Sequence, residues 1–148
     1  MQTVIKTFAE LGTEELYEIL RLREAVFIVE QDCPYPEADG RDYDAVHYFY
    51  KEDDGHVVAY LRLYRKKDEP DTVQVGRVVT AASVRGTGMG GSILHEGVQY
   101  AVGQMGARQL YLEAQVYAIG FYEKEGFAVS SEEFLEDGIP HVEMRRKA

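Results

Sequence analysis

The stretch Arg85-Gly-Thr-Gly-Met-Gly-Gly-Ser92 places four glycines in the six positions 86–91, between a predicted strand and a predicted helix. Glycines let a backbone approach a ligand closely and adopt positive φ angles. The free N–H groups in the first turn of a helix, together with the helix dipole, favour an anion at that point. Arg85 adds positive charge and forked donors. The stretch therefore predicts a site for one phosphate or two linked phosphates; the alternative is a tight turn that binds nothing.

This glycine-rich turn lies inside a strand–helix–strand unit. The strand Val73–Val79 precedes it, a helix with one apolar face follows, and the strand Leu110–Ala114 comes next. That order predicts a right-handed crossover between two parallel strands. Upstream, Asp53-Asp-Gly55 separates the apolar runs Val46–Tyr50 and Val57–Tyr64, which predicts a hairpin. Antiparallel hairpins followed by one parallel crossover predict a mixed α/β sheet.

The N-terminal third combines a helix with a long loop. Thr13 is the expected N-cap of a helix that opens at Glu14, and Arg23 is the one polar break in its apolar stripe. Two prolines and a glycine make Gln31–Gly40 a loop, and long ordered loops are often functional. The residue order in Asp39–Asp44 is wrong for an EF-hand loop, so we interpret this segment as a solvated acidic turn.

The C-terminal part predicts further short elements. Pro70-Asp71 is expected to lie in the turn before the third strand. Ala118–Glu125 reads as a short helix, and Phe127–Val129 and His141–Met144 read as closing strands joined by the loop Glu136–Pro140.

Composition sets the broad class. The 148 residues, 45% of them apolar, fit a single domain over residues 1–148. No apolar run approaches the roughly 18 residues that a membrane span needs, and Met1–Lys6 lacks the apolar region of a signal peptide, so we expect a cytoplasmic protein. The net charge of −10 disfavours nucleic acid as a partner and favours a cationic ligand.

The cysteine and the histidines predict neither a disulfide nor a metal site. Cys33 is the one cysteine, so no intrachain disulfide can form. The four histidines include no HxH or HExxH pair, because Gln99 stands four places after His95.

Two known phosphate motifs can be compared with the turn. The Gly-Lys-Ser/Thr of a Walker A loop is absent. Gly86, Gly88 and Gly91 satisfy the dinucleotide pattern GxGxxG, and Glu113 lies about 20 residues on, where an acidic ribose partner is expected. A doubly wound fold would need several more strand–helix units than the one crossover found here. A nucleotide-dependent oxidoreductase therefore stays as the less favoured alternative.

Two motifs carry a family resemblance. Val78-Val-Thr80 followed by Arg85-Gly-Thr-Gly-Met-Gly90 resembles the acetyl-CoA motif of GNAT N-acetyltransferases, and Phe121-Tyr-Glu-Lys-Glu-Gly-Phe127 resembles the family's second signature. Four further segments are similar to the ElaA-like branch of that family. They are Leu22–Gln31, Pro34-Tyr35, Asp39-Gly40 and Asp137–His141.

The resemblance implies the GNAT fold and acetyl-CoA as co-substrate, with two parallel strands that splay apart where the cofactor enters. Val78, Val79 and Thr80 would pair with the pantetheine amides, and Phe121 and Tyr122 would contact the cofactor. The pyrophosphate would be bound by the turn residues Arg85, Gly86, Thr87, Gly88, Met89, Gly90, Gly91 and Ser92.

The implied reaction is direct attack of a primary amine on the thioester in one ternary complex. Tyr122 matches the tyrosine that can protonate the leaving thiolate. Glu113 is the first candidate for the general base, because it lies on the strand that lines the predicted gap; Glu30, His47 and His141 are alternatives.

The acceptor is left open among a small amine, an amino sugar, an antibiotic and a protein amine. The loop Gln31–Asp44 is expected to shape its pocket. The resemblance also allows a homodimer. A GNAT-fold module that binds acyl-CoA without turnover is the second function considered.

Overall fold

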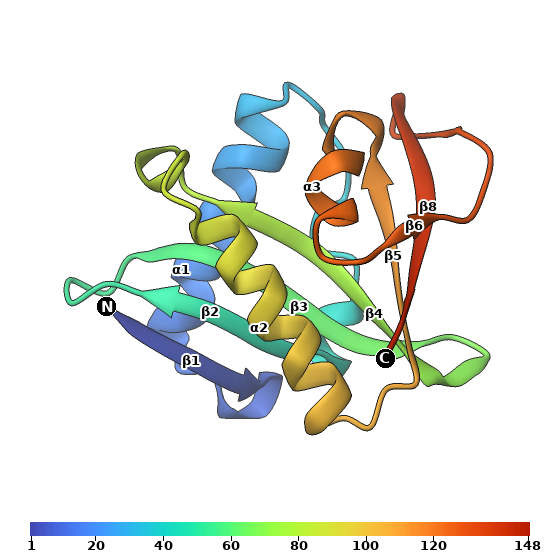
Figure 1. Ribbon diagram of the computed structural model, residues 1–148. Helices are drawn as coiled ribbons and strands as arrows, with labels where there is room; N and C mark the ends of the chain where they lie inside the picture. Colours follow the sequence, from blue (N-terminus) through green and yellow to red (C-terminus); the bar gives the residue numbers. More distant parts are fainter.

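One mixed sheet organises the chain, and the computed structural model describes all residues from 1 to 148 (Figure 1). Its strand order is β1-β2-β3-β4-β5-β8-β6, with β7 paired to β8. The strands are β1 (Gln2–Thr7), β2 (Val46–Lys51), β3 (Val57–Lys66), β4 (Glu69–Thr80), β5 (Gln109–Gln115), β6 (Ala128–Val129), β7 (Phe134–Glu136) and β8 (Ile139–Lys147).

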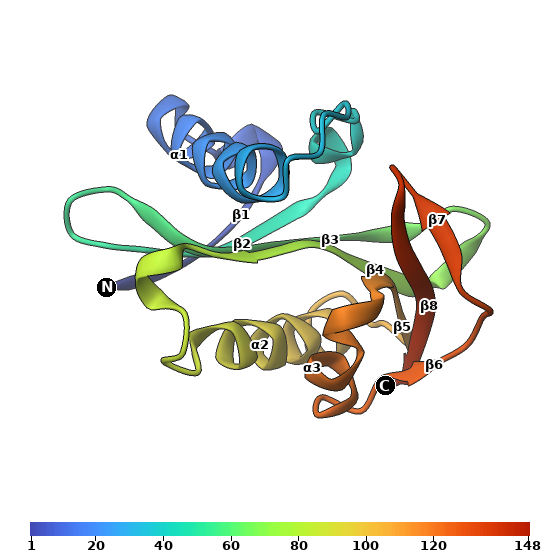
Figure 2. The same cartoon turned by 90° about the horizontal axis from the view of Figure 1, so that it is seen from above.

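Helices cover both faces of the sheet. Figure 2 shows α1 on one face and α2 and α3 on the other. The α-helices are α1 (Thr13–Arg23), α2 (Met89–Gly103) and α3 (Ile119–Glu123). A π-helical segment, η2 (Glu24–Glu30), continues α1, and the 3-10 turns are η1 (Phe8–Glu10), η3 (Arg41–Asp44), η4 (Ala82–Val84) and η5 (Val116–Ala118). None of these helices has the length and apolar character needed to cross a bilayer.

The strand pairing confirms the predicted topology. Strands β1 to β4 pair in antiparallel order, β4 and β5 are parallel, and β8 is antiparallel to β5. Helix α2 makes the crossover from β4 to β5 and buries Ile93, Leu94 and Val98 against the sheet. Gly97 is required in this contact, because a Cβ there would lie 2.9 Å from Cδ2 of the buried Leu61.

Several predicted boundaries were wrong at the N-terminal end. Strand β1 was not predicted, although its register beside β2 buries Val4. Thr13 is the first residue of α1 rather than its N-cap. The backbone N–H of Gly12 donates to the Glu15 carboxylate at 2.9 Å, and this contact satisfies one of the helix's free donors.

Two turns also differ from their predicted positions. Pro70 and Asp71 lie inside β4, and the chain turns instead at Asp68, whose φ is +65°. The predicted loop Glu136–Pro140 is a tight turn between β7 and β8, formed by Asp137 and Gly138 with φ angles of +50° and +76°. Strand β7 was missed because it is only three residues long.

Candidate functional site

The parallel strands β4 and β5 separate soon after they meet. Only Thr72, Val73 and Gln74 of β4 pair with β5, at Gln109, Leu110 and Tyr111. Beyond Gln74, β4 continues to Thr80 with β3 on one side and no strand on the other. The register with β3 is also irregular here, and Arg77 within this segment has a φ of +51°.

Two cavities fill the space beside the separated strands. The "turn cavity" has a volume of about 580 Å³ and is lined by Val79, Thr80 and Arg85 among others. The "carboxylate cavity" has a volume of about 340 Å³ and is lined by Glu113 and Glu136 among others. The two share six lining residues, which are Phe27, Gln31, Val78, Gln115, Tyr117 and Ile139. The two cavities therefore adjoin each other where β4 and β5 separate.

The glycine-rich turn has the backbone geometry that the sequence predicts. Gly86 and Gly88 have φ angles of +78° and +84°, and Gly88 is the N-cap of α2. The first hydrogen bond of the helix runs from the N–H of Ser92 to the carbonyl of Gly88. The N–H groups of Met89, Gly90 and Gly91 consequently have no helical acceptor and can serve an anion.

Arg85 is engaged by a carboxylate in this structure. Its Nη1 and Nη2 donate to the two oxygens of Glu30 at 2.5 and 2.7 Å, and Nη2 also reaches the carbonyl of Thr80. Both side chains are about half exposed, and the hydrogen bonds from Arg85 lower the pKa of Glu30. The pair thus joins η2 to the start of the turn, and Glu30 is an ionised ion-pair partner rather than a free base.

Tyr122 presents an unpartnered hydroxyl to the carboxylate cavity. It lies on α3, where its ring packs edge-on against Phe121 at 5.0 Å and against Phe127 at 6.2 Å between centroids. No protein group hydrogen-bonds its hydroxyl, and burial raises its pKa. The phenol is therefore protonated near neutral pH and available as a donor.

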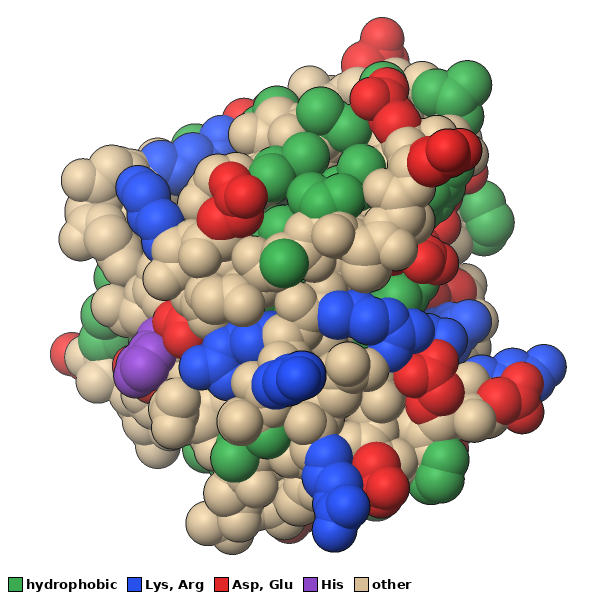
Figure 3. All heavy atoms as spheres, turned by 45° about the vertical axis from the view of Figure 1, so that its right-hand side comes forward, with side chains coloured by type: hydrophobic (Ala, Val, Ile, Leu, Met, Phe, Trp, Pro, Cys, Tyr) green, Lys and Arg blue, Asp and Glu red, His purple; other side chains and the backbone are tan.

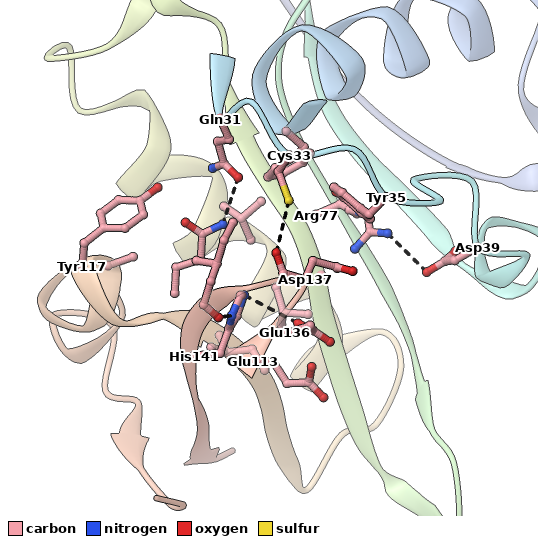
Figure 4. Close-up of a pocket in the computed structure, with 18 of the residues that line it drawn as sticks. Gln31, Cys33, Tyr35, Asp39, Arg77, Glu113, Tyr117, Glu136, Asp137 and His141 are labelled. Atoms are coloured by element: carbon pink, nitrogen blue, oxygen red, sulfur yellow. Dashed lines mark hydrogen bonds and ion pairs between the residues drawn. The ribbon is translucent and has the colours of Figure 1, made fainter. Parts of the chain in front are cut away.

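Three titratable side chains from different strands meet in the carboxylate cavity. Figure 4 shows Glu113 from β5, Glu136 from β7 and His141 from β8 side by side. The His141 Nε2 lies 3.5 Å from the Glu136 carboxylate, and its Nδ1 contacts the carbonyl of Ile139 at 2.7 Å. Burial and the negative charge of Glu113 raise the pKa of Glu136.

Sequence reasoning identified Glu113 and His141 but missed Glu136. The tight turn between β7 and β8 brings Glu136 opposite Ile139, close to His141. A hairpin turn predicted at Asp137-Gly138 would have placed Glu136 opposite Ile139 and close to His141.

His47, the remaining candidate base, lies away from the site. It is fully buried, and its two ring nitrogens contact the Tyr60 hydroxyl at 2.7 Å and the Asp42 carbonyl at 2.9 Å. Burial lowers its pKa. His47 lines neither cavity, so the structure gives it a role in packing.

The loop between η2 and β2 is fixed by an arginine–carboxylate network. Arg23 Nη1 donates to Asp42 at 2.8 Å and Arg62 Nη2 donates to Asp39 at 2.6 Å. The complete "loop network" joins three cations to three anions, which are Arg23, Arg62, Arg77, Glu37, Asp39 and Asp42. The interpretation of Asp39–Asp44 as a solvated acidic turn was wrong, because Asp39 and Asp42 neutralise buried guanidinium groups.

The same loop forms one wall of the carboxylate cavity. Cys33, Tyr35 and Pro36 line it. The Cys33 thiol lies 3.5 Å from the carbonyl of Asp137, and the Gln115 side chain donates to Gln31 at 3.2 Å (Figure 4). These two contacts join the loop to β5 and to the β7–β8 turn across the space between β4 and β5.

Basic and acidic side chains gather on different parts of one face of the molecule. Figure 3 shows a band of basic side chains across the middle of the face and acidic side chains beside hydrophobic ones in its upper part. The exposed hydrophobic residues include Tyr117 and Leu135, on η5 and β7. Within the protein, no group of three or more His, Cys, Asp or Glu side chains is arranged to hold a metal ion.

The separated strands and the glycine-rich start of α2 are accompanied by a match to a known protein family. The family model for an acetyltransferase (GNAT) domain matches residues 14–148. The chain belongs to the GNAT acetyltransferase family.

The relatives of this GNAT chain agree with that assignment. Escherichia coli protein ElaA is 37% identical over 142 residues, which are 94% of this chain and 92% of that protein. The crystal structure of E. coli ElaA superimposes with a TM-score of 0.91 at 34% identity, over 99% of both chains. An acyl-CoA N-acyltransferase from Pseudomonas aeruginosa superimposes with a TM-score of 0.90 at 38% identity, over 99% of both chains. The predicted fold and the predicted resemblance to ElaA-like GNAT proteins are confirmed.

The loop network predicts how stability depends on pH. Burial alone would raise the pKa of Asp42, but hydrogen bonds from Arg23 and Arg62 outweigh it and hold the pKa below its usual value. The folded state therefore binds fewer protons than the unfolded state, so this stabilisation is present above about pH 4 and is lost as the pH falls further. We expect Asp42→Asn to lower the free energy of unfolding by about 3–5 kcal/mol at pH 7, because two buried guanidinium groups lose a partner.

The measurement is a series of urea unfolding curves between pH 7 and pH 3. The variant should also lose less stability than the parent as the pH falls, since it lacks the titrating group. Asp44→Asn is the matched control, because Asp44 is exposed in the same 3-10 turn and has no ion-pair partner. Equal stability of the Asp42 and Asp44 variants would contradict the role assigned to the network.

Proposed function

We propose that this GNAT protein transfers an acetyl group from acetyl-CoA to a primary amine by direct attack in a ternary complex. The observation that carries the proposal is the separation of β4 and β5, which leaves the edge of β4 from Val75 to Thr80 without a strand partner. Backbone N–H and C=O groups need hydrogen-bond partners. A ligand with amide groups can supply them to Val78, Val79 and Thr80.

The residues present fit such a cofactor. The unpaired edge of β4 leads to the start of α2, where the free N–H groups of Met89, Gly90 and Gly91 suit a pyrophosphate. Arg85 can add its guanidinium once Glu30 releases it, and Phe121 lies beside Gly90. When bound, acetyl-CoA supplies an activated thioester.

Tyr122 is the proposed general acid. Its neutral hydroxyl has no competing hydrogen bond and faces the cavity beside the separated strands. A thiol has a pKa of about 8.5 and a phenol of about 10, so the thiolate can leave with little help, and Tyr122 can assist by donating a hydrogen bond as negative charge develops on the sulfur.

Glu113 is the proposed general base. An ammonium group has no lone pair, so the acceptor must lose a proton before or during its attack. Glu113 faces the carboxylate cavity from β5, and its carboxylate accepts a hydrogen bond from Tyr111 at 3.1 Å. It has no Lys, Arg or His ion-pair partner, which leaves an oxygen available for a proton.

Binding of the cofactor can be tested by thermal unfolding. At about a hundred times its dissociation constant, acetyl-CoA should add about 2.7 kcal/mol to the free energy of unfolding and raise Tm by several degrees. NADH and ATP at the same concentrations serve as controls and should leave Tm unchanged. An unchanged Tm with acetyl-CoA would overturn the proposed function, and a rise with NADH would favour a dinucleotide site instead.

The role of Tyr122 is tested by Tyr122→Phe. This variant keeps the ring packing against Phe121 and Phe127 and removes only the hydroxyl, so we expect turnover to fall at least about tenfold with no loss of acetyl-CoA affinity. Release of free CoA is the readout. A turnover number equal to that of the parent would leave Tyr122 as a packing residue, and no turnover by the parent with any amine would favour a binding module.

The role of Glu113 is tested by Glu113→Gln. We expect turnover to fall at least about tenfold and the acidic limb of the pH–rate profile to change, because that limb reports the titration of the base. Glu143→Gln is the matched control, since Glu143 lies opposite Glu113 in the register and shares the Tyr111 hydroxyl but lines no part of the cavity. A profile like that of the parent would exclude Glu113 as the base.

A further inference from the structure

The two walls of the carboxylate cavity differ in charge balance. On one wall, Arg77 is neutralised by Glu37 and Asp39 of the loop network. On the other, Glu113 and Glu136 have no lysine or arginine within ion-pair distance, and the imidazole of His141 is the one basic side chain beside Glu136. The uncompensated charge of the cavity is therefore negative.

His141 is the third polar side chain at this wall of the carboxylate cavity. Its side chain is only 9% exposed, its Nδ1 is held by the carbonyl of Ile139, and its Nε2 lies 3.5 Å from the Glu136 carboxylate. Figure 4 shows that this ring lies beside Glu136 at the cavity. The ring thus places its Nε2 next to the Glu136 carboxylate at the cavity, so a ligand group that binds Glu136 also meets this nitrogen.

We propose that the carboxylate cavity binds a small diamine as the acceptor. One of its amines reacts, and Glu136 recognises the second, which stays cationic. The inference rests on the proposed function, because it names the acceptor class for the same site.

The chemistry of the reaction separates two roles for the carboxylates. The amine that attacks must be neutral, so it cannot keep an ion pair with Glu113 during the reaction. A second ammonium group stays protonated and can keep one with Glu136, where it also relieves the repulsion between the two carboxylates. The His141 Nε2 can accept a hydrogen bond from the same group. The cavity volume of about 340 Å³ lies near the lower end of the range for small-molecule sites, which suits a short ligand.

The test compares two ligands of nearly equal size by titration calorimetry. The probes are 1,4-diaminobutane and 4-amino-1-butanol, which differ only in an ammonium group against a hydroxyl group. We expect the parent protein to bind the diamine at least about tenfold more tightly, since a charge-assisted hydrogen bond contributes about 1.5–3 kcal/mol and a tenfold change corresponds to about 1.4 kcal/mol. Glu136→Gln should bring the two affinities within about threefold of each other.

Two further variants control for charge and folding. Glu133→Gln removes the same charge from an exposed position that lines neither the carboxylate cavity nor the turn cavity, and it should keep the preference for the diamine. Glu136→Asp keeps the charge on a shorter side chain and should keep part of the preference. Urea unfolding of each variant shows whether it is folded.

Failure of this inference is distinguishable from failure of the proposed function. The titrations are run with and without CoA, so the preference for the diamine is measured whether or not the protein transfers an acetyl group. Equal affinity of the parent for the two probes, or an undiminished preference in Glu136→Gln, would overturn the inference. A diamine preference that depends on Glu136, found together with no effect of acetyl-CoA on Tm, would overturn the proposed function and leave the cavity as a diamine-binding site.

Discussion

The unsatisfied backbone of β4 is the constraint on which the site depends. A strand in the middle of a sheet normally finds partners on both sides, and the N–H and C=O groups of β4 lose theirs on one side after Gln74. The separation makes room for two adjoining cavities, brings Val78 into the lining of both, and lets residues of β5, β7 and β8 face the loop that follows η2. A ligand that lies along this edge replaces a missing strand.

The loop network explains how an irregular wall can hold its shape. Arg23 and Arg62 are almost completely buried, and such groups are tolerated only when carboxylates pair with them. The carboxylates come from the loop. The arginines can therefore be buried only when the loop is ordered around them. Tyr35 belongs to the same structure, because the Arg77 guanidinium lies 5.5 Å from the centre of its ring. The cavity wall is thereby fixed before any ligand arrives.

The sequence predicted the parts of the molecule that local chemistry determines. The glycine-rich turn, the apolar face of α2 and the crossover from β4 to β5 follow from local periodicity and from glycine's freedom in φ. Contacts between distant segments were not predictable in this way. Asp39 and Asp42 looked solvated because the arginines they neutralise lie on α1 and β3, and Glu136 was missed because its neighbours Glu113 and His141 belong to two other strands. The three-residue strand β7 is too short to show periodicity.

The exposed pair between Arg85 and Glu30 has a consequence for the kinetics of ligand entry. A free guanidinium beside the turn would attract any dissolved carboxylate or phosphate, whereas the guanidinium of Arg85 is already paired with Glu30. Exposed ion pairs contribute only about 0–1 kcal/mol, so a multivalent phosphate can displace Glu30 while a monovalent anion gains little by doing so. Displacement of Glu30 from Arg85 therefore depends on the charge of the incoming anion. Because Glu30 lies on η2 and lines the turn cavity together with Arg85, its displacement would break the ion pair that joins η2 to the turn.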